Sequence, residues 1–252
     1  MKRRIPALMA ALVLAVAGCT PAAAPAPTSA PASPSRGEIA IRGCSPVGPL
    51  LPAATLDPCG LRVVEAVNSG LTRANPATGQ PELELADAID STDPQTFTVR
   101  LAKGKKFQDA TEVRARNFVS AWNWAAYGPN QMAAQSWFSF IEGAEAMNCA
   151  PGEPCSLDGR PTSISGLKVI DDHTFSIRTT HPVVDLRTQL AHPVFSPLPD
   201  SLFAEGAGKE MFGQLPVGAG PFRIDRNTAT EFILDAADEY DGRRRPKVAR
   251  VT

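Results

Sequence analysis

The sequence predicts an α+β domain, and three observations support this prediction. Some stretches place apolar residues at helical spacing, whereas others alternate apolar and polar residues as half-buried strands do. The strand-like stretches come in pairs and do not alternate singly with helices, so the pattern is not that of a regular βαβ protein. The 24 prolines and 19 glycines indicate short elements and many turns.

The chain begins with the layout of a secretory signal peptide. Lys2, Arg3 and Arg4 form a basic start, residues 5–17 form a short apolar run, and small residues follow. The apolar run is too short to span a bilayer with margin. We therefore expect residues 1–18 to be a leader that is removed on export.

Cys19 ends the sequence VAGC, which resembles the lipobox of bacterial lipoproteins, where the cysteine becomes the acylated first residue. Because each buried CH₂ contributes about 0.8 kcal/mol, a multiply acylated Cys19 would hold the protein at the extracytoplasmic face of the cell membrane. The alternative is an ordinary secretory signal with an incidental cysteine. Residues 19–37 are dominated by Pro, Ala and Ser, so we expect a disordered tether before the body at 38–252.

Within the body, the first predicted elements are two helices and a strand. Residues 60–71 have apolar side chains at helical spacing, and Gly70 suits the helix end. Residues 95–101 alternate as a half-buried strand, and residues 112–126 return to the helical period. Trp122, in that second helix, is expected in the core.

The later stretches predict two strand pairs and a short helix. The pairs are 166–170 with 174–179, around a turn at Asp171 and Asp172, and 220–225 with 231–236; the short helix is 183–191. An acidic pair at a turn is more typical of a solvated surface than of acid–base chemistry.

The cysteines indicate an oxidising compartment. With Cys19 set aside, four cysteines form two sequence-local sets, Cys44 with Cys59 and Cys149 with Cys155, and we predict these two disulfides among the three pairings that four cysteines allow. The first bridge should contribute about 3 kcal/mol by loop entropy.

The sequence shows no signature of metal binding, catalysis or nucleic-acid binding. No CxxC occurs, and His173, His181 and His192 lack the spacing of a metal motif, so we predict neither a metal site nor a cofactor. Neither a G-x-S-x-G elbow nor a P-loop is present, and no catalytic residue is assigned. The chain has 25 basic and 26 acidic residues, and three of the basic ones lie in the leader, so a nucleic-acid partner is not expected.

Five motifs in order resemble the family of extracytoplasmic solute-binding proteins that serve peptide and nickel ABC importers, known as family 5. They are LPAATLDPCG, VVEAVNSGLTRANPATGQPELELADAI, DPQTFTVRLAKGKKFQDATEVRARNFVSAW, PVGAGPFRID and DEYDGRRRPKVARV. The resemblance covers Ile39 to Val251. It implies a mixed-sheet lobe of a two-lobed, class II periplasmic-binding-protein-like fold, with the second lobe absent, because family members are roughly twice as long. We therefore expect a fragment or truncation, and the alternative is a stand-alone half. Ala110 departs from the family, which usually has glycine there.

The resemblance also implies the function and the partners. The intact protein would close over a peptide or similar small solute, and the ABC permease and its ATPase subunits would import it without any chemistry in this chain. By position, the family's ligand contacts match Ser45, Pro46 and Val47 after the first strand, and Trp137 and Phe138 after the long helix. The alternative for these two aromatic residues is a place in the core.

The family's glycine-rich motif near residue 220 has a structural interpretation here. Gly218, Ala219 and Gly220 are expected to allow close backbone passage. Two other functions stay open at this point: an envelope lipoprotein with a scaffolding role, and a secreted hydrolase whose nucleophile is not recognised.

Overall fold

The computed structural model describes residues 37–149, 155, 159–206, 209–228 and 231–252. The predicted signal peptide, Cys19 and all of the tether except Gly37 lie outside the described residues. In the described part of the chain, every helix is too short or too polar to traverse a bilayer.

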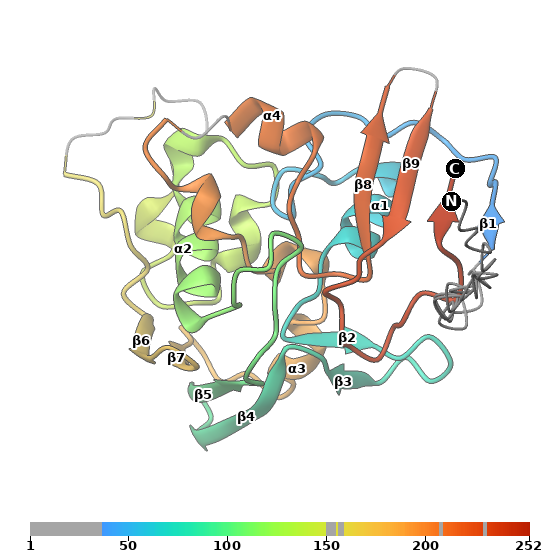
Figure 1. The fold of residues 1–252 in the computed structure, drawn as a ribbon. Helices are drawn as coiled ribbons and strands as arrows, with labels where there is room; N and C mark the ends of the chain where they lie inside the picture. Colours follow the sequence, from blue (N-terminus) through green and yellow to red (C-terminus); the bar gives the residue numbers. More distant parts are fainter. Residues whose placement is uncertain (1–36, 150–154, 156–158, 207–208, 229–230) are drawn as a thin grey trace, which may run out of the picture. The chain divides into compact units, whose positions relative to one another are not determined.

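The fold is a mixed α and β structure, as the sequence predicts (Figure 1). The α-helices are α1 (Pro58–Val67), α2 (Ala115–Ala126), α3 (Leu186–Gln189) and α4 (Lys209–Gln214). The strands are β1 (Glu38–Ile39), β2 (Thr72–Ala74), β3 (Pro81–Leu83), β4 (Ala86–Asp93), β5 (Thr96–Leu101), β6 (Leu167–Asp171), β7 (Thr174–Arg178), β8 (Phe222–Asn227), β9 (Phe232–Ala236) and β10 (Arg250–Val251). Five 3₁₀ turns, η1 (Gly128–Asn130), η2 (Gln135–Phe138), η3 (Glu145–Met147), η4 (Pro193–Phe195) and η5 (Asp200–Leu202), complete the described elements.

The main core lies between α2 and an antiparallel sheet of order β4-β5-β7-β6. The predicted alternation of β5 places Phe97 and Val99 on its buried face. Trp122 of α2 is fully buried and donates its indole N–H to the carbonyl of Phe195 at 3.1 Å. Phe175 of β7 packs edge-on against the same indole ring. The prediction that Trp122 belongs to the core is confirmed.

A second sheet has the order β1-β10-β9-β8, with β1 parallel to β10 and the other pairs antiparallel. Helix α1 lies against β8 and β9 (Figure 1), where Val63 and Val67 meet partly buried Phe232 and Leu234. The predicted strand pairs are confirmed as β6–β7 and β8–β9. Helix α1 begins two residues before the predicted stretch because the Asp57 carboxylate accepts from the backbone N–H groups of its first turn.

The Gln108 side chain connects the loop after β5 to α1 and β8. Its amide nitrogen donates to the carbonyls of Val67 at 3.0 Å, Gly220 at 3.2 Å and Phe222 at 2.7 Å, and its amide oxygen accepts from the Gly218 N–H at 3.0 Å. One side chain thereby satisfies backbone groups from two distant segments. Because unpaired buried backbone groups are costly, this amide fixes how the segments meet.

A second connection joins the C-terminal segment to α1 and to Glu84, the residue that follows β3. Arg244 donates to the Glu84 carboxylate at 2.8 Å and to the carbonyls of Glu65 and Asn68, each at 2.8 Å. The Tyr240 hydroxyl also donates to Glu84, at 3.2 Å. Burial, together with the nearby negative charge of Glu84, raises the pKa of Tyr240 above its ordinary value.

The Ala110→Gly substitution is predicted to stabilise the protein by about 0.5–1 kcal/mol. Ala110 has a φ of 65°, in the left-handed region where a Cβ is strained, inside the turn closed by the bond from Phe107 N–H to the Thr111 carbonyl. Urea unfolding of the two proteins measures the difference. As a control, Ala102→Gly, at a position outside the positive-φ region, should destabilise the protein; equal losses in both variants would contradict the strain argument.

Gly218→Ala is predicted to destabilise the fold by about 3 kcal/mol or to prevent folding. A Cβ at Gly218 would lie 2.1 Å from the Val67 carbonyl oxygen, and neither backbone can move without breaking the Gln108 bonds. Gly43→Ala is the matched control, because nothing lies within 4 Å of the Cβ built there. Thermal unfolding of both variants tests the prediction, which is wrong if they melt at the same temperature.

Candidate ligand-binding site

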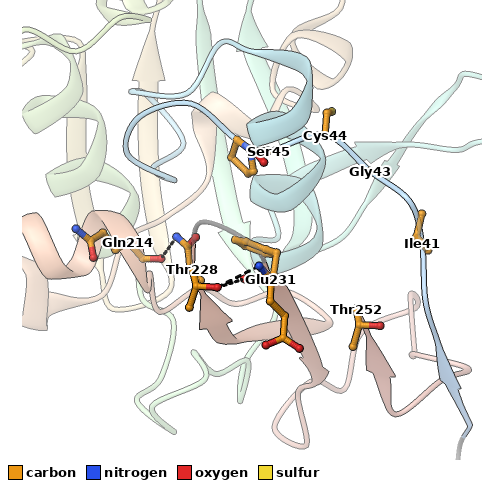
Figure 2. A pocket seen from close by; sticks show the side chains of 11 residues that line it. Ile41, Gly43, Cys44, Ser45, Gln214, Thr228, Glu231 and Thr252 are labelled. Carbon is orange, nitrogen blue, oxygen red and sulfur yellow. Dashed lines mark hydrogen bonds between the residues drawn. The ribbon is translucent and has the colours of Figure 1, made fainter.

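A surface pocket of about 560 Å³ lies between the segment after β1 and the β8–β9 hairpin (Figure 2). It is lined by Ile41, Gly43, Cys44, Ser45, Pro46, Gln214, Asn227, Thr228, Glu231, Phe232 and Thr252. The two parts of its wall are more than 150 residues apart in the sequence, so the pocket exists only because the fold brings them together.

Helix α1 anchors residues 44–47, the segment that carries the predicted contacts. The predicted disulfide between Cys44 and Cys59 is present, with a Cα–Cα distance of 5.8 Å, and ties the segment to the first turn of the helix. The Asp57 carboxylate, which caps that turn, also accepts from the Val47 N–H at 3.4 Å. The bridge and the cap together restrict residues 44–47 without covering them.

The second predicted disulfide, between Cys149 and Cys155, is also present, with a Cα–Cα distance of 5.1 Å. Both predicted pairings are therefore confirmed. Neither cysteine of this second bridge lines the pocket, so it provides a natural control for the first.

Of the three predicted contact residues in the segment after β1, the structure places two in the pocket wall and one outside it. Ser45 and Pro46 line the pocket, whereas Val47 lies outside its wall with 75% of its surface exposed. No hydrogen bond joins the backbone of Ser45 to another described residue, so its N–H and C=O are free to pair with a ligand.

The opposite wall of the pocket was not identified from the sequence. At the hairpin, the Thr228 hydroxyl donates to the Glu231 carbonyl at 3.1 Å, and the Asn227 amide donates to the Gln214 carbonyl at 3.1 Å. Glu231 forms an ion pair with Arg226 at 2.7 Å. The polar run NTATE around the predicted hairpin turn was the available signal, but nothing local indicates that it faces the segment after β1.

The two predicted aromatic contacts have different environments. Trp137 is 41% exposed and its ring lies on that of His192, with 4.0 Å between centroids. Phe138 is fully buried and packs edge-on against Phe195. The assignment of Phe138 to ligand contact is therefore corrected to a core position, because η2 turns its side chain inward, and Trp137 stays the candidate. Neither of the two lines the pocket.

His192 is a neighbour of Trp137 that sequence reasoning missed. Its Nδ1 accepts from the Val194 N–H at 3.2 Å, which caps η4 and leaves Nε2 as the protonated nitrogen of the neutral ring. Burial lowers the pKa of His192 below its ordinary value.

The site offers hydrogen-bonding groups and shape. Within the described ranges, no three His, Cys, Asp or Glu side chains gather where they could hold a metal ion. The polar groups of the pocket are hydroxyl, amide, carboxylate and backbone groups, which suit reversible binding of a small polar ligand.

Sequence comparison identifies the class of protein. Residues 80–252 match the family model "Bacterial extracellular solute-binding proteins, family 5 Middle", and the chain belongs to this family. The expected resemblance is confirmed. Because this is a family of solute-binding proteins, the hydrolase alternative is not supported.

Curated relatives include several named as oligopeptide-binding proteins. The chain is 28% identical over 193 residues to "Oligopeptide-binding protein OppA" of Bacillus subtilis, covering 75% of this chain and 34% of the relative. It is 31% identical over 137 residues to "Periplasmic oligopeptide-binding protein OppA" of Escherichia coli, covering 54% and 23%. The chain thus spans about a third or less of the length of these relatives.

Solved structures share the fold. The unliganded open form of "MppA Periplasmic Murein Tripeptide Binding Protein" superposes with a TM-score of 0.72 at 19% identity, over 87% of this chain and 41% of that one. "Listeria monocytogenes OppA bound to peptide" gives 0.72 at 21% identity, over 87% and 42%. The described fold therefore corresponds to one lobe of this architecture.

Removing the Cys44–Cys59 bridge is predicted to loosen the candidate ligand segment. In the Cys44→Ser/Cys59→Ser protein, hydrogen exchange at the Val47 N–H should accelerate at least about tenfold, because only the long bond to Asp57 would still hold it. The fold should lose at most about 3 kcal/mol. Cys149→Ser/Cys155→Ser should leave this exchange rate unchanged; equal acceleration in both variants would show a general loss of stability instead.

Acidification is predicted to titrate His192 with a midpoint below 6.5 and to change Trp137 fluorescence. Because the folded-state pKa is lowered, the unfolded chain binds more protons between the two pKa values, so this residue reduces stability as the pH falls through 6.5. His192→Asn keeps an acceptor for the Val194 N–H and cannot titrate. Fluorescence titration should show the transition in the wild type and not in the variant. A transition in both proteins would mean that a group other than His192 titrates.

Proposed function

We propose that the chain forms part of a substrate-binding lipoprotein of an ABC importer, which captures oligopeptides or a similar small solute outside the cell. The observation that carries this proposal is the exposed segment 44–47, held at the rim of a pocket by a disulfide, in a chain whose relatives are named oligopeptide-binding proteins.

Capture would proceed by backbone pairing and closure. A peptide would pair with the free N–H and C=O of Ser45, as an added strand pairs with a sheet edge. Such pairing does not depend on side chains, so many peptides could be accepted. Pro46, Val47 and Trp137 would contact the ligand's side chains, and hinge closure against a second lobe would enclose it. The permease and ATPase subunits would then drive uptake.

The test of ligand capture is a chemical-shift titration of the chain with tetra-alanine. If an intact binder had micromolar affinity and half of the free energy came from the other lobe, this chain would bind at about millimolar strength. Saturable shifts are expected at residues 45–47 and at the Trp137 indole. Tetra-alanine methylated at its peptide nitrogens is the control and should bind far more weakly. Absence of saturable shifts up to about 10 mM, or equal binding of the methylated peptide, would refute the mechanism.

The lipoprotein part of the proposal has a separate test. Mass spectrometry of the membrane fraction should find a mature chain that begins at acylated Cys19, and Cys19→Ala should release the protein from the membrane. A mature chain with an unmodified Cys19 would contradict the lipid anchor and would indicate an ordinary secreted binding protein.

A further inference from the structure

Three cations that form no ion pair with a described residue lie on the segment before β10. Arg243, Arg245 and Lys247 are exposed, and the residues between them are partly buried, so the three side chains are on the solvent side of the segment. No ion pair or hydrogen bond joins any of them to another described residue. The chain carries a net charge of −1, so this basic row does not follow from a basic composition.

The surrounding charges leave the row positive. Some nearby acidic residues are paired with other cations: Asp241 with Lys105, Glu84 with Arg244, and Asp235 with Arg250. Three carboxylates near the segment form no ion pair with a described residue: Asp238 and Glu239, five and four residues before Arg243, and Glu38, which lies opposite Arg250 on β1. Glu239 is partly buried, so the exposed unpaired charges are the two carboxylates of Glu38 and Asp238 against three cations, and these carboxylates reduce the potential of the row without cancelling it.

The row lies next to the point where the predicted tether joins the body. The Ala249 N–H donates to the carbonyl of Gly37, the last residue of the predicted tether, at 2.8 Å. Strand β1 starts at the following residue and pairs in parallel with β10. Lys247 is only two residues from Ala249, so the basic segment and the entry of the tether occupy the same part of the body.

We propose that Arg243, Arg245 and Lys247 form a membrane-facing surface that binds the anionic headgroups of phospholipids. This inference rests on the proposed acylation of Cys19. An extended tether of residues 20–37 would reach about 55 Å and would leave the body free to turn. Cations at the entry of the tether would restrict that motion, because an acyl anchor and a basic patch are the two signals that together give stable membrane attachment.

The experiment measures how the full-length, processed chain partitions onto vesicles of phosphatidylcholine alone and of phosphatidylcholine with 30% phosphatidylglycerol. The test variant is Arg243→Gln/Arg245→Gln/Lys247→Gln. The matched control is Lys103→Gln/Lys106→Gln/Lys168→Gln, which removes three other exposed lysines and changes the net charge equally. Thermal unfolding checks that both variants fold, as expected for exposed positions.

Each cation near an anionic surface contributes about fivefold to binding, so three contribute about 100-fold at most. Because the nearby carboxylates reduce this, the test variant should lose about 10- to 100-fold of its partitioning onto the anionic vesicles at low salt. The control should change by no more than about threefold, and high salt should abolish the difference between test variant and wild type. Equal losses in both variants, or no loss in the test variant, would overturn the inference. Binding to vesicles of phosphatidylcholine alone reports the acyl anchor separately. If the wild type does not bind them, the proposed acylation is contradicted. The comparison of variants on anionic vesicles still decides the role of the basic row.

Discussion

The Gln108 amide is the interaction on which the arrangement of the molecule depends. It bonds to the C-terminal end of α1 through Val67 and to the start of β8 through Gly218, Gly220 and Phe222. Both glycines are needed there, because a Cβ on either would overlap the Val67 backbone. The Gln108 hydrogen bonds and the close packing of the two glycines on Val67 therefore fix the position of the β8–β9 hairpin relative to α1.

The candidate pocket depends on the same Gln108 contacts. One wall is the segment tied to α1 by Cys44–Cys59 and by the Asp57 cap, and the other wall is the hairpin that starts beyond the Gln108 contacts. Because α1 is the common support, a change that shifted it would alter both walls. A ligand site that is built in this way is largely formed before the ligand arrives.

The chemistry of the pocket favours reversible capture. Its free backbone groups at Ser45 and its hydroxyl and amide groups can form many hydrogen bonds of modest strength. Membership in the family of bacterial extracellular solute-binding proteins agrees with this character. The disulfides strengthen the lobe locally: each closes a short loop, and one of them restrains the segment that would meet the ligand.

The sequence by itself determined the elements whose signals are local. The period of α2 predicted the burial of Trp122, the alternation of β5 predicted its inner face, and short cysteine separations predicted both disulfides. Only the tertiary structure decided the rest. The two-residue strands β1 and β10 form because each supplies hydrogen bonds to the other from the opposite end of the body. Phe138 is buried by a residue 57 positions away, Phe195, and the pocket joins segments from both ends of the body. Contacts between distant residues depend on how the elements pack, and no local period encodes that packing.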